Sequence, residues 1–425
     1  MARSITLTLG AGLGSDLGPN FNLTADVGSV TPSSGTKTEL LAGKSVSVDD
    51  TATQVTVTSI GSCTNPITQN IPCITTTTTT TTTYPTTGQL YYKVAVSRDD
   101  VTPSNDGKYV ISGRGNTNSV IISNNYGTGF RIVSINFGVG AGTASVGVSG
   151  TGQYMYVVEV KQADKWIWRS EDYGVTFLRV STFTTPRAWS SISVSRTGQY
   201  VMATSTNVDE VAPTTNSNNW FLISQYWLSS DYGVTFVRIN NAPSGQRYFL
   251  YGSAISSNGQ SQLLICPNEI TEFNSEAYVS LNAGGTFTTK AVTSSVTYYD
   301  CGMSLDGTKL VIAGSGGNFN NPFALTNTLL VKSSDSGGTF TTFGTTQQKW
   351  FNVAVEGNGT TVLATTYDAG YIYRSTNFGT VSAVTGPGSR GWADIAISYS
   401  GYAYATEQTG IWRSTDSGAS WSKLS

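Results

Sequence analysis

Short runs of alternating apolar and polar residues extend along most of the chain, and glycine-containing turns separate them. This alternation, with a period of two, is typical of β-strands. One unit recurs seven times: an apolar run, a glycine turn and a second apolar run. The first runs and their turn glycines are 94–97 with Gly107, 146–148 with Gly152, 192–194 with Gly198, 254–256 with Gly259, 303–305 with Gly307, 353–355 with Gly359, and 395–397 with Gly401.

A second motif follows each unit, with the pattern Ser-x-Asp/Asn-x-Gly-x-Thr/Ser-Phe/Trp; we call it the box. Successive boxes begin 47, 59, 51, 53, 42 and 39 residues apart, and the copy that begins at Ser375 is degraded. Such a period, with about four short strands per unit, is typical of a β-propeller. Both markers count seven, so the sequence predicts an all-β chain with a seven-bladed propeller over residues 89–425.

The box resembles the Asp-box, or BNR, repeat of sialidases, sortilin-type receptors and some xyloglucan-degrading glycosidases. The resemblance covers about residues 91–425 and implies a folding element on the turn between the third and fourth strands of a blade, distant from the active site. Locally, the Asp or Asn is expected to bond to the backbone of the turn and the glycine to take a positive φ. Structural roles are therefore expected for Asn125, Asp172, Asp231, Asn282, Asp335, Asn377 and Asp416.

The chain before the propeller divides into two further parts. Residues 1–73 contain alternating runs such as 5–9, 46–48 and 55–58, which predict a small β-sandwich-like domain. Residues 74–88 include nine consecutive threonines (75–83), which offer no hydrophobic face, so we expect an extended linker. Glycosylation of this run as a stalk is an open alternative.

Composition removes several classes of function. The chain has no histidine, which excludes Ser-His-Asp and Cys-His nucleophiles and imidazole-ligated metals, and we expect no cofactor and no metal site. Only 12% of the residues are charged and the net charge is −2, which disfavours nucleic acid as a partner. No apolar stretch approaches a membrane span of roughly 20 residues, so we expect no membrane insertion.

Four cysteines are too few for a disulfide framework. Cys63 and Cys73 could bridge across a loop that contains proline. Cys266 and Cys301 lie in apolar strand contexts and are expected to be buried free thiols.

Candidate catalytic residues are sparse. Sialidases need three arginines, but Arg169, Arg374 and Arg413 each precede a box serine, which favours a structural or surface role. The resemblance to inverting xyloglucanases, which use two aspartates on separate blades, directs attention to acidic residues near strand ends. Three aspartates meet that description: Asp300, Asp368 and Asp394. Asp394 is the best of them, although nothing in the sequence pairs it with another carboxylate.

Aromatic residues recur just before the inner strands and suggest a binding face. Trp189, Trp350 and Trp392 are examples, and Arg187 and Arg390 each stand two residues before a tryptophan. A ring of aromatic faces with occasional arginine suits carbohydrate. Packing between blades is the alternative, and we favour it for each aromatic taken singly.

The N-terminal residues alternate like a strand and lack an apolar h-region, so we expect no secretory signal peptide. Residues 1–85 resemble a β-module of tailed-phage structural proteins, especially crAss-like phages of Bacteroidetes. The resemblance rests on residues 5–12, 18–23, 40–43 and 59–65. This implies a protein made in the host cytoplasm and placed on the virion surface in several copies, with residues 1–73 bound to other virion proteins.

The resulting hypothesis is a phage head or tail appendage that displays its propeller for adhesion to host-surface or mucosal glycans. A glycosidase or depolymerase acting on surface polysaccharide and a ligand-free structural decoration are the alternatives. The sequence shows no strand exchange that would close the propeller ring. We therefore expect closure by side-chain packing or by a segment near residues 84–90.

Overall fold

A computed structural model describes most of the chain. The described residues are 2–7, 20–26, 28–42, 44–49, 54–60, 66–70, 101–113, 118–135, 142–160, 166–184, 187–207, 223–239, 252–266, 276–290, 292, 296–316, 325–407 and 410–424. The chain divides into two compact units, Met1–Pro85 and Thr86–Ser425. The expected linker at 74–88, the clasp segment near 84–90, and Cys63 and Cys73 lie outside the described residues.

The first unit is built from two antiparallel sheets, one of β1 and β4 and one in the order β3-β2-β5-β6. Its elements are β1 (Ala2–Leu7), β2 (Asn20–Ala25), β3 (Ser34–Thr36), α1 (Lys37–Ala42), β4 (Lys44–Asp49), β5 (Gln54–Ile60) and β6 (Pro66–Asn70). Val46 and Val48 of one sheet share a buried cluster with Leu23 and Val55 of the other. The two sheets therefore enclose a common core, as expected of a sandwich.

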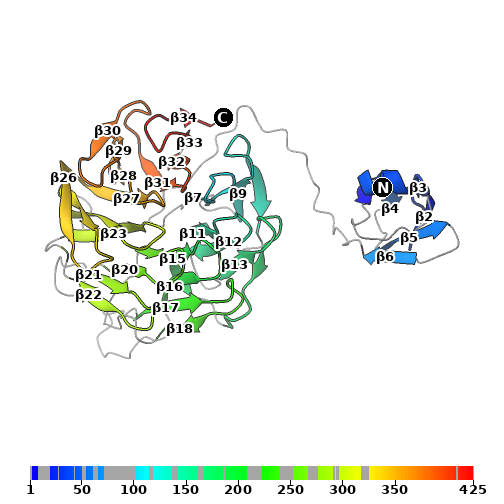
Figure 1. Ribbon diagram of the computed structural model, residues 1–425, viewed down its shortest axis with the longest axis horizontal. Helices are drawn as coiled ribbons and strands as arrows, with labels where there is room; N and C mark the ends of the chain where they lie inside the picture. Colours follow the sequence, from blue (N-terminus) through cyan, green and yellow to red (C-terminus); the bar gives the residue numbers. More distant parts are fainter. Residues whose placement is uncertain are drawn as a thin grey trace, which may run out of the picture. The chain divides into compact units, whose positions relative to one another are not determined.

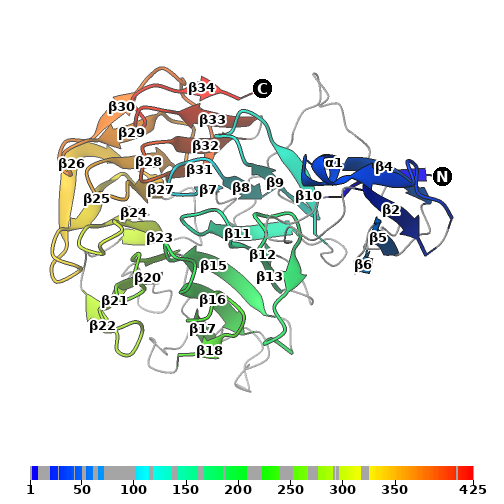
Figure 2. The ribbon, with the colours of Figure 1, turned by 45° about the vertical axis from the view of Figure 1, so that its right-hand side comes forward.

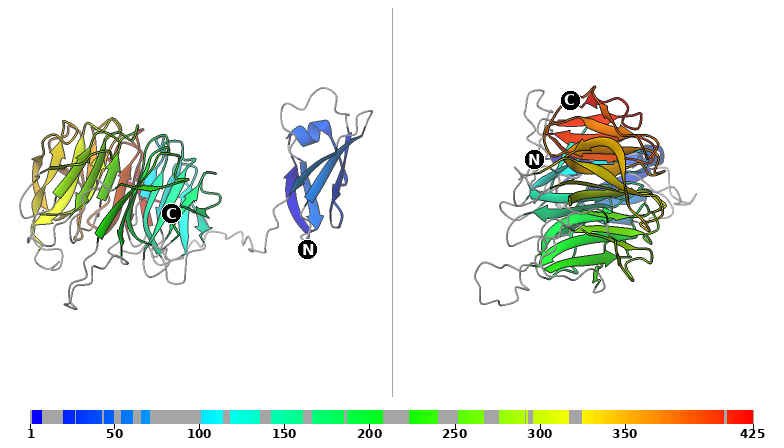
Figure 3. Two further views of the ribbon diagram at one scale, coloured as in Figure 1. Left: turned by 90° about the horizontal axis from the view of Figure 1, so that it is seen from below. Right: turned by 90° about the vertical axis from the view of Figure 1, so that its left-hand side faces the viewer.

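The helix α1 is an element that the alternating pattern did not predict, and it lies at one end of the strands of this unit (Figure 3). Its start is a capping box. The Thr36 hydroxyl accepts a hydrogen bond from the Glu39 backbone N–H at 3.2 Å, and the Glu39 carboxylate accepts one from the Thr36 N–H at 2.8 Å. These bonds satisfy two backbone donors that a helix start leaves free.

The second unit contains seven four-stranded antiparallel sheets arranged as blades around a centre (Figure 1). The predicted all-β fold with seven blades is confirmed. Consecutive innermost strands contact one another around the ring. From the innermost strand outward, blade 1 is β7 (Val101–Pro103), β8 (Val110–Gly113), β9 (Ser119–Ser123) and β10 (Arg131–Ser134); blade 2 is β11 (Gly142–Val148), β12 (Met155–Val160), β13 (Ile167–Ser170) and β14 (Leu178–Arg179); blade 3 is β15 (Ala188–Val194), β16 (Val201–Asn207), β17 (Ile223–Ser229) and β18 (Val237–Arg238); blade 4 is β19 (Gly252–Ile255), β20 (Gln262–Cys266), β21 (Glu276–Ser280) and β22 (Thr288–Lys290).

The remaining blades follow the same order. Blade 5 is β23 (Val296–Met303), β24 (Leu310–Gly316), β25 (Thr328–Ser333) and β26 (Thr341–Gln348); blade 6 is β27 (Trp350–Val355), β28 (Val362–Thr366), β29 (Ile372–Ser375) and β30 (Ser382–Val384); blade 7 is β31 (Trp392–Ile397), β32 (Ala403–Glu407), β33 (Gly410–Ser414) and β34 (Ser422–Lys423). In blade 1, the described inner strand β7 lies closer to Gly107 than the predicted run 94–97, which is outside the described residues.

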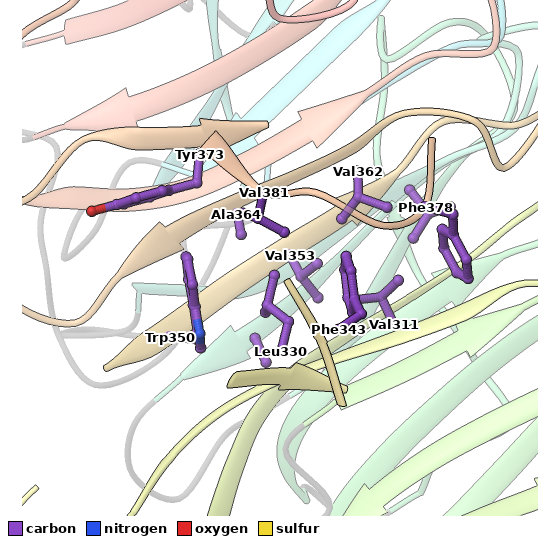
Figure 4. Close-up of a cluster of buried hydrophobic side chains, with 12 residues drawn as sticks. Val311, Leu330, Phe343, Trp350, Val353, Val362, Ala364, Tyr373, Phe378 and Val381 are labelled. Atoms are coloured by element: carbon purple, nitrogen blue, oxygen red, sulfur yellow. The ribbon is translucent and has the colours of Figure 1, made fainter. Parts of the chain in front are cut away.

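The core of the propeller lies between its blades. Seven clusters of buried side chains each draw residues from two neighbouring blades, one cluster for each interface of the ring. Figure 4 shows the cluster between blades 5 and 6, where Phe343 and Phe378 lie near Val311 and Val362. Both faces of a blade are therefore buried, and the predicted free thiols Cys266 and Cys301 are buried within these interfaces.

The ring closes through contacts between blades 7 and 1, which lie side by side in Figure 2. Val110 and Ile121 of blade 1 pack with Tyr404 and Ile411 of blade 7. The Tyr404 hydroxyl donates to the Gly107 carbonyl at 2.9 Å. Within the described residues, every blade takes all four strands from one continuous stretch of chain. A backbone hydrogen bond from the Ser400 N–H to the Asn105 carbonyl at 3.0 Å also joins blade 7 to blade 1. The alternative of a clasp near residues 84–90 falls outside the described part of the chain.

Candidate functional site

The seven boxes lie on the turns between the third and fourth strands of the blades, the position that the resemblance implies. Blade 5 shows the geometry. The Ser333 hydroxyl donates to Asp335 Oδ1 at 2.7 Å and accepts the Gly337 N–H at 2.9 Å. The Thr339 N–H and hydroxyl donate to the two oxygens of Asp335 at 2.9 and 2.8 Å. The carboxylate is thus engaged within its own turn.

These bonds also lower the pKa of the carboxyl group in the box. The Thr339 backbone N–H, with the Ser333 and Thr339 hydroxyls, lowers the pKa of Asp335 to about 2. Asn282 takes the same place in blade 4, where its amide donates to the Thr286 hydroxyl at 3.0 Å and its carbonyl oxygen accepts the Thr286 N–H at 2.8 Å. An amide replaces the carboxylate, so the box requires hydrogen bonds rather than a charge.

The residue before the box glycine takes a left-handed conformation that the sequence did not reveal. This holds in all seven boxes, with φ between 53° and 62°, at Tyr126, Tyr173, Tyr232, Ala283, Ser336, Phe378 and Ser417. In six boxes the following glycine is left-handed too. The exception is Gly379 of blade 6, the degraded box.

Cations next to the boxes join neighbouring blades. Arg169 Nε, Arg374 Nε and Arg413 Nη1 donate to the carbonyls of Tyr232, Ser417 and Tyr126 at 2.6, 2.7 and 2.6 Å. Each acceptor is the left-handed residue in the box of the next blade. The structural role favoured for these arginines therefore matches their contacts.

The tryptophans considered for a stacking face are buried between blades. Trp189, Trp350 and Trp392 are 4%, 0% and 3% exposed. The indole N–H groups of Trp350 and Trp392 donate to the carbonyls of Thr328 and Gly370, each in the preceding blade. The binding interpretation of these three residues is wrong, and the alternative of packing between blades accounts for them.

The two candidate arginines lie apart, in blades 3 and 7. Arg187 Nη1 donates to Gln225 Oε1 at 2.5 Å, and its guanidinium lies 4.5 Å from the centre of the Trp227 ring. Arg390 lies equally close to Trp412, donates to the Pro387 carbonyl at 2.7 Å and approaches Glu407 at 3.6 Å. Each arginine packs on the third strand of its own blade, so the structure does not assemble them into one site.

The structure does bring Asp300 and Asp394 to one cavity of about 240 Å³, lined by the inner strands of blades 2–7. Each lies just after a register shift in its strand, β23 or β31. Asp300 accepts the Cys301 N–H on one oxygen at 2.8 Å and the Val353 N–H of blade 6 on the other at 2.9 Å. Asp394 is 5% exposed.

Other polar residues occupy the same register of the inner strands, four positions before the first residue of the glycine turn. Ser145 accepts the Ile192 N–H of the next blade at 3.2 Å, which is the contact that Asp300 makes with Val353. Asn352 donates to the Ala393 carbonyl of blade 7 at 2.9 Å. We call the described polar residues at this register, Ser145, Ser191, Asp300, Asn352 and Asp394, the channel ring. Counting back from the turn would have found it in the sequence.

The third candidate, Asp368, does not line this cavity. It follows β28 and forms an exposed ion pair with Lys349 at 2.8 Å. Over the described ranges, no three Cys, Asp or Glu residues lie close enough together to hold a metal ion. No helix in the described part of the chain is long and apolar enough to cross a membrane.

Comparison with known proteins identifies the fold. No protein family profile matches the chain, and no curated protein matches it. Among solved structures, the GH74 enzyme of Niastella koreensis is similar (TM-score 0.57, 16% identity, covering 78% of this chain and 55% of the enzyme). Hydrazine synthase of Kuenenia stuttgartiensis is similar to the same degree (TM-score 0.57, 12% identity, covering 77% and 97%). This chain thus spans about half the length of the GH74 enzyme, and these similarities show a β-propeller fold.

Proposed function

We propose that the chain is a bacteriophage virion structural protein, a head or tail appendage that displays its propeller for adhesion to host-surface or mucosal glycans. The resemblance of residues 1–85 to a tailed-phage module supports attachment to other virion proteins. The geometry of the boxes supports a relation to Asp-box repeats. Several copies on one particle would turn weak glycan contacts into useful avidity.

One observation supports display rather than catalysis. Both carboxylate oxygens of Asp300 accept backbone N–H groups, and one of these bonds reaches the next blade. Ser145 and Asn352 also bond to the next blade. Asp300, Ser145 and Asn352 therefore hold neighbouring blades together, which suits a rigid scaffold.

Cryo-microscopy of the parent particle tests the virion assignment. We expect residues 1–73 to contact another virion protein and the propeller to project outward. A first unit free of any virion contact would contradict the attachment. A glycan array probed with the full chain tests adhesion separately, and binding to none of its glycans would count against adhesion.

A glycosidase or depolymerase is the second candidate, favoured by the cavity that Asp300 and Asp394 share. Inverting glycosidases use two carboxyl groups on opposite sides of the scissile bond. The full chain would be incubated with host capsular polysaccharide and assayed for released oligosaccharides. Loss of release in Asp394→Asn, with Asp368→Asn as the active control, would establish this function; release that persists in Asp394→Asn would exclude Asp394 as its catalytic residue.

A further inference from the structure

Three tyrosines occupy the same place in the boxes of blades 1, 2 and 3. Tyr126, Tyr173 and Tyr232 are the left-handed residues before the box glycine, and they are 37%, 41% and 38% exposed. We call them the tyrosine row. Because the box turns and the glycine turns lie at the same end of the antiparallel strands, the row belongs to one end of the propeller, which we call the box face.

Each tyrosine of the row lies against a second tyrosine from the glycine turn of the preceding blade. The ring centres are 5.0 Å apart for Tyr109–Tyr173, and the planes are inclined by 30°. The equivalent pairs have nearly the same geometry, at 5.1 Å for Tyr402–Tyr126 and 4.9 Å for Tyr154–Tyr232. One side of each aromatic ring in the tyrosine row is thus covered by its partner tyrosine, so the exposed fraction belongs to the rest of that aromatic ring.

An arginine of the preceding blade also holds the backbone of each residue in the tyrosine row. Its carbonyl accepts a guanidinium N–H from Arg413 for Tyr126, from Arg131 for Tyr173 and from Arg169 for Tyr232, at 2.6, 3.1 and 2.6 Å. The same combination of two tyrosines and one arginine therefore occurs at three successive interfaces. Rings held in this way lose little conformational entropy when they bind a ligand.

The tyrosines are not needed to form the turn. Blades 4, 5 and 7 place Ala283, Ser336 and Ser417 at this position with φ of 54°, 58° and 53°. Those blades keep the same bonds within the box, as in the acceptance of the Gly284 N–H by Ser280 at 3.0 Å. Three half-exposed aromatic rings are therefore an addition to the fold, confined to one part of the ring.

The surroundings favour an uncharged, hydroxyl-rich ligand. The three arginines are partly buried and already engaged with carbonyls, and Arg169 also pairs with Glu171 at 2.9 Å. Asp172 and Asp231 accept bonds from threonines of their own boxes. Besides the Glu171 carboxylate, which remains exposed although it is paired with Arg169, the accessible groups are ring surface and phenolic hydroxyl, which stack on a sugar ring and bond to its hydroxyls.

We infer that the tyrosine row binds a neutral polysaccharide along the box face, with regularly spaced sugar units of one chain, rather than adjacent ones, on successive Tyr–Tyr–Arg sites; this inference rests on the proposed adhesive function. A polymer of identical units fits a surface that repeats from blade to blade, whereas the surface of a protein partner has no such repeat. The strongest evidence for a protein partner instead is a set of exposed aliphatic residues on the same blades, including Leu178 and Val237 on the outer strands.

The test compares full-length variants by affinity electrophoresis in gels that contain dextran, hydroxyethyl cellulose or mannan as neutral probes and alginate as an acidic one. The test variant is Tyr126→Ala/Tyr173→Ala/Tyr232→Ala, since blade 4 carries alanine at this place. Tyr367→Ala is the first matched control, because Tyr367 is 40% exposed but lies at the opposite end of the strands, after β28. Leu178→Thr/Val237→Thr is the second, because Thr288 and Thr341 stand at these places in blades 4 and 5.

We expect a neutral probe to retard the wild-type chain, and the triple variant to bind it about tenfold or more weakly, because three aromatic contacts act together on one polymer. Both controls should bind like wild type.

Equal binding by the triple variant and by wild type would overturn the inference and leave the proposed adhesion standing. Retardation by alginate alone would overturn the neutral ligand. Loss of binding in the aliphatic control alone, or protease-sensitive binding to host envelopes without any retardation, would indicate a protein partner and overturn the inference. No retardation by any probe, together with no binding on the glycan array, would contradict both proposals.

Discussion

The box of blade 6 and the regular box of blade 5 form the same turn with different backbone conformations and different burial of the residue before the glycine. In blade 5, Ser336 and Gly337 are both left-handed, and Ser336 lies outside the buried core. In blade 6, only Phe378 is left-handed, and its ring is 6% exposed. It stacks on Phe343 at 5.7 Å, between blades 5 and 6 (Figure 4).

This difference shows which parts of the box are fixed and which are free. The serine and the Asp or Asn bond to the turn in both versions. The residue before the glycine is open to change: a serine in blade 5, a tyrosine in blades 1–3 and a buried phenylalanine in blade 6. Variation at this one position can therefore serve either packing or binding without loss of the blade.

The largest expected effect on stability comes from the residue before the box glycine. Phe378→Ala should lower the free energy of unfolding by about 3–5 kcal/mol, because it empties a buried aromatic site. Tyr173→Ala should cost only about 1 kcal/mol, since its ring is half exposed and loses one aromatic contact. Urea unfolding followed by tryptophan fluorescence measures both, because all nine tryptophans lie in the propeller region. Equal losses would show that Phe378 is not a core residue.

The glycine after it should show the next largest contrast. A Cβ added to Gly337 would meet Val279 Cγ2 at 2.6 Å at a φ of +82°. Gly337→Ala should therefore cost about 3 kcal/mol through backbone strain and overpacking. Gly379 lies outside the left-handed region, and its added Cβ would come no closer than 3.2 Å, to the Asn377 side chain. Gly379→Ala should cost less than about 1 kcal/mol, and a similar loss at both glycines would remove the distinction between the two turns.

The box serine should show a smaller contrast. Ser333→Ala leaves the buried Gly337 N–H without its acceptor, at an expected cost of about 1–2 kcal/mol. In blade 6 the Gly379 N–H also has Asn377 Oδ1 as an acceptor at 3.0 Å, and its bond to Ser375 is longer, at 3.2 Å. Ser375→Ala should therefore cost about 0.5 kcal/mol. The same urea titration decides, and a larger loss in blade 6 would contradict the shared-acceptor account.

The smallest effect is expected with pH. Burial alone would raise the pKa of Asp416, but donors from Ser420 and Ser414 outweigh it and lower that pKa to about 2, as other donors do for Asp335. A lowered folded-state pKa stabilises the fold above the ordinary pKa near 3.8, and that stability is lost as the pH falls towards 2.

Asp335→Asn/Asp416→Asn should therefore leave stability at neutral pH nearly unchanged, because Asn282 fills the same place in blade 4. The double variant should lose less stability than wild type between about pH 4 and pH 2, because the amides do not titrate there. Tryptophan fluorescence during acid titration measures this, with the blade 6 variant Asn377→Ala as a control that changes no charge. Parallel acid curves for wild type and the double variant would contradict the assignment.

The fold could be predicted because its markers are local. The glycine turns and the boxes each require particular residues within a few positions, and both counted seven blades. The box also located the turn between the third and fourth strands, and the place of Arg413 before a box serine indicated a structural role. The identity of its acceptor, the Tyr126 carbonyl 287 residues away, was beyond reach of a local pattern.

The candidate site was harder to predict because blades stack face to face. Alternation identifies a strand with one buried face, but here both faces of a strand are covered by neighbouring blades. Trp350 could therefore be placed before an inner strand without any sign that it was fully buried. The tyrosine row was missed for a related reason, since a tyrosine at a turn carries no signal of what it stacks on in the next blade.

The manner of closure makes the starting point of the circle arbitrary. Blades 1 and 7 meet through packing and side-chain hydrogen bonds of the kind found at the other interfaces, such as the Tyr156 hydroxyl on the Tyr232 carbonyl and the Tyr404 hydroxyl on the Gly107 carbonyl. The described sheets share no strand across any of the seven junctions. A circularly permuted chain, cut between two other blades and joined from the end of blade 7 to the start of blade 1, would keep every described sheet whole. The order of the blades in the gene is thus separable from the architecture that they build.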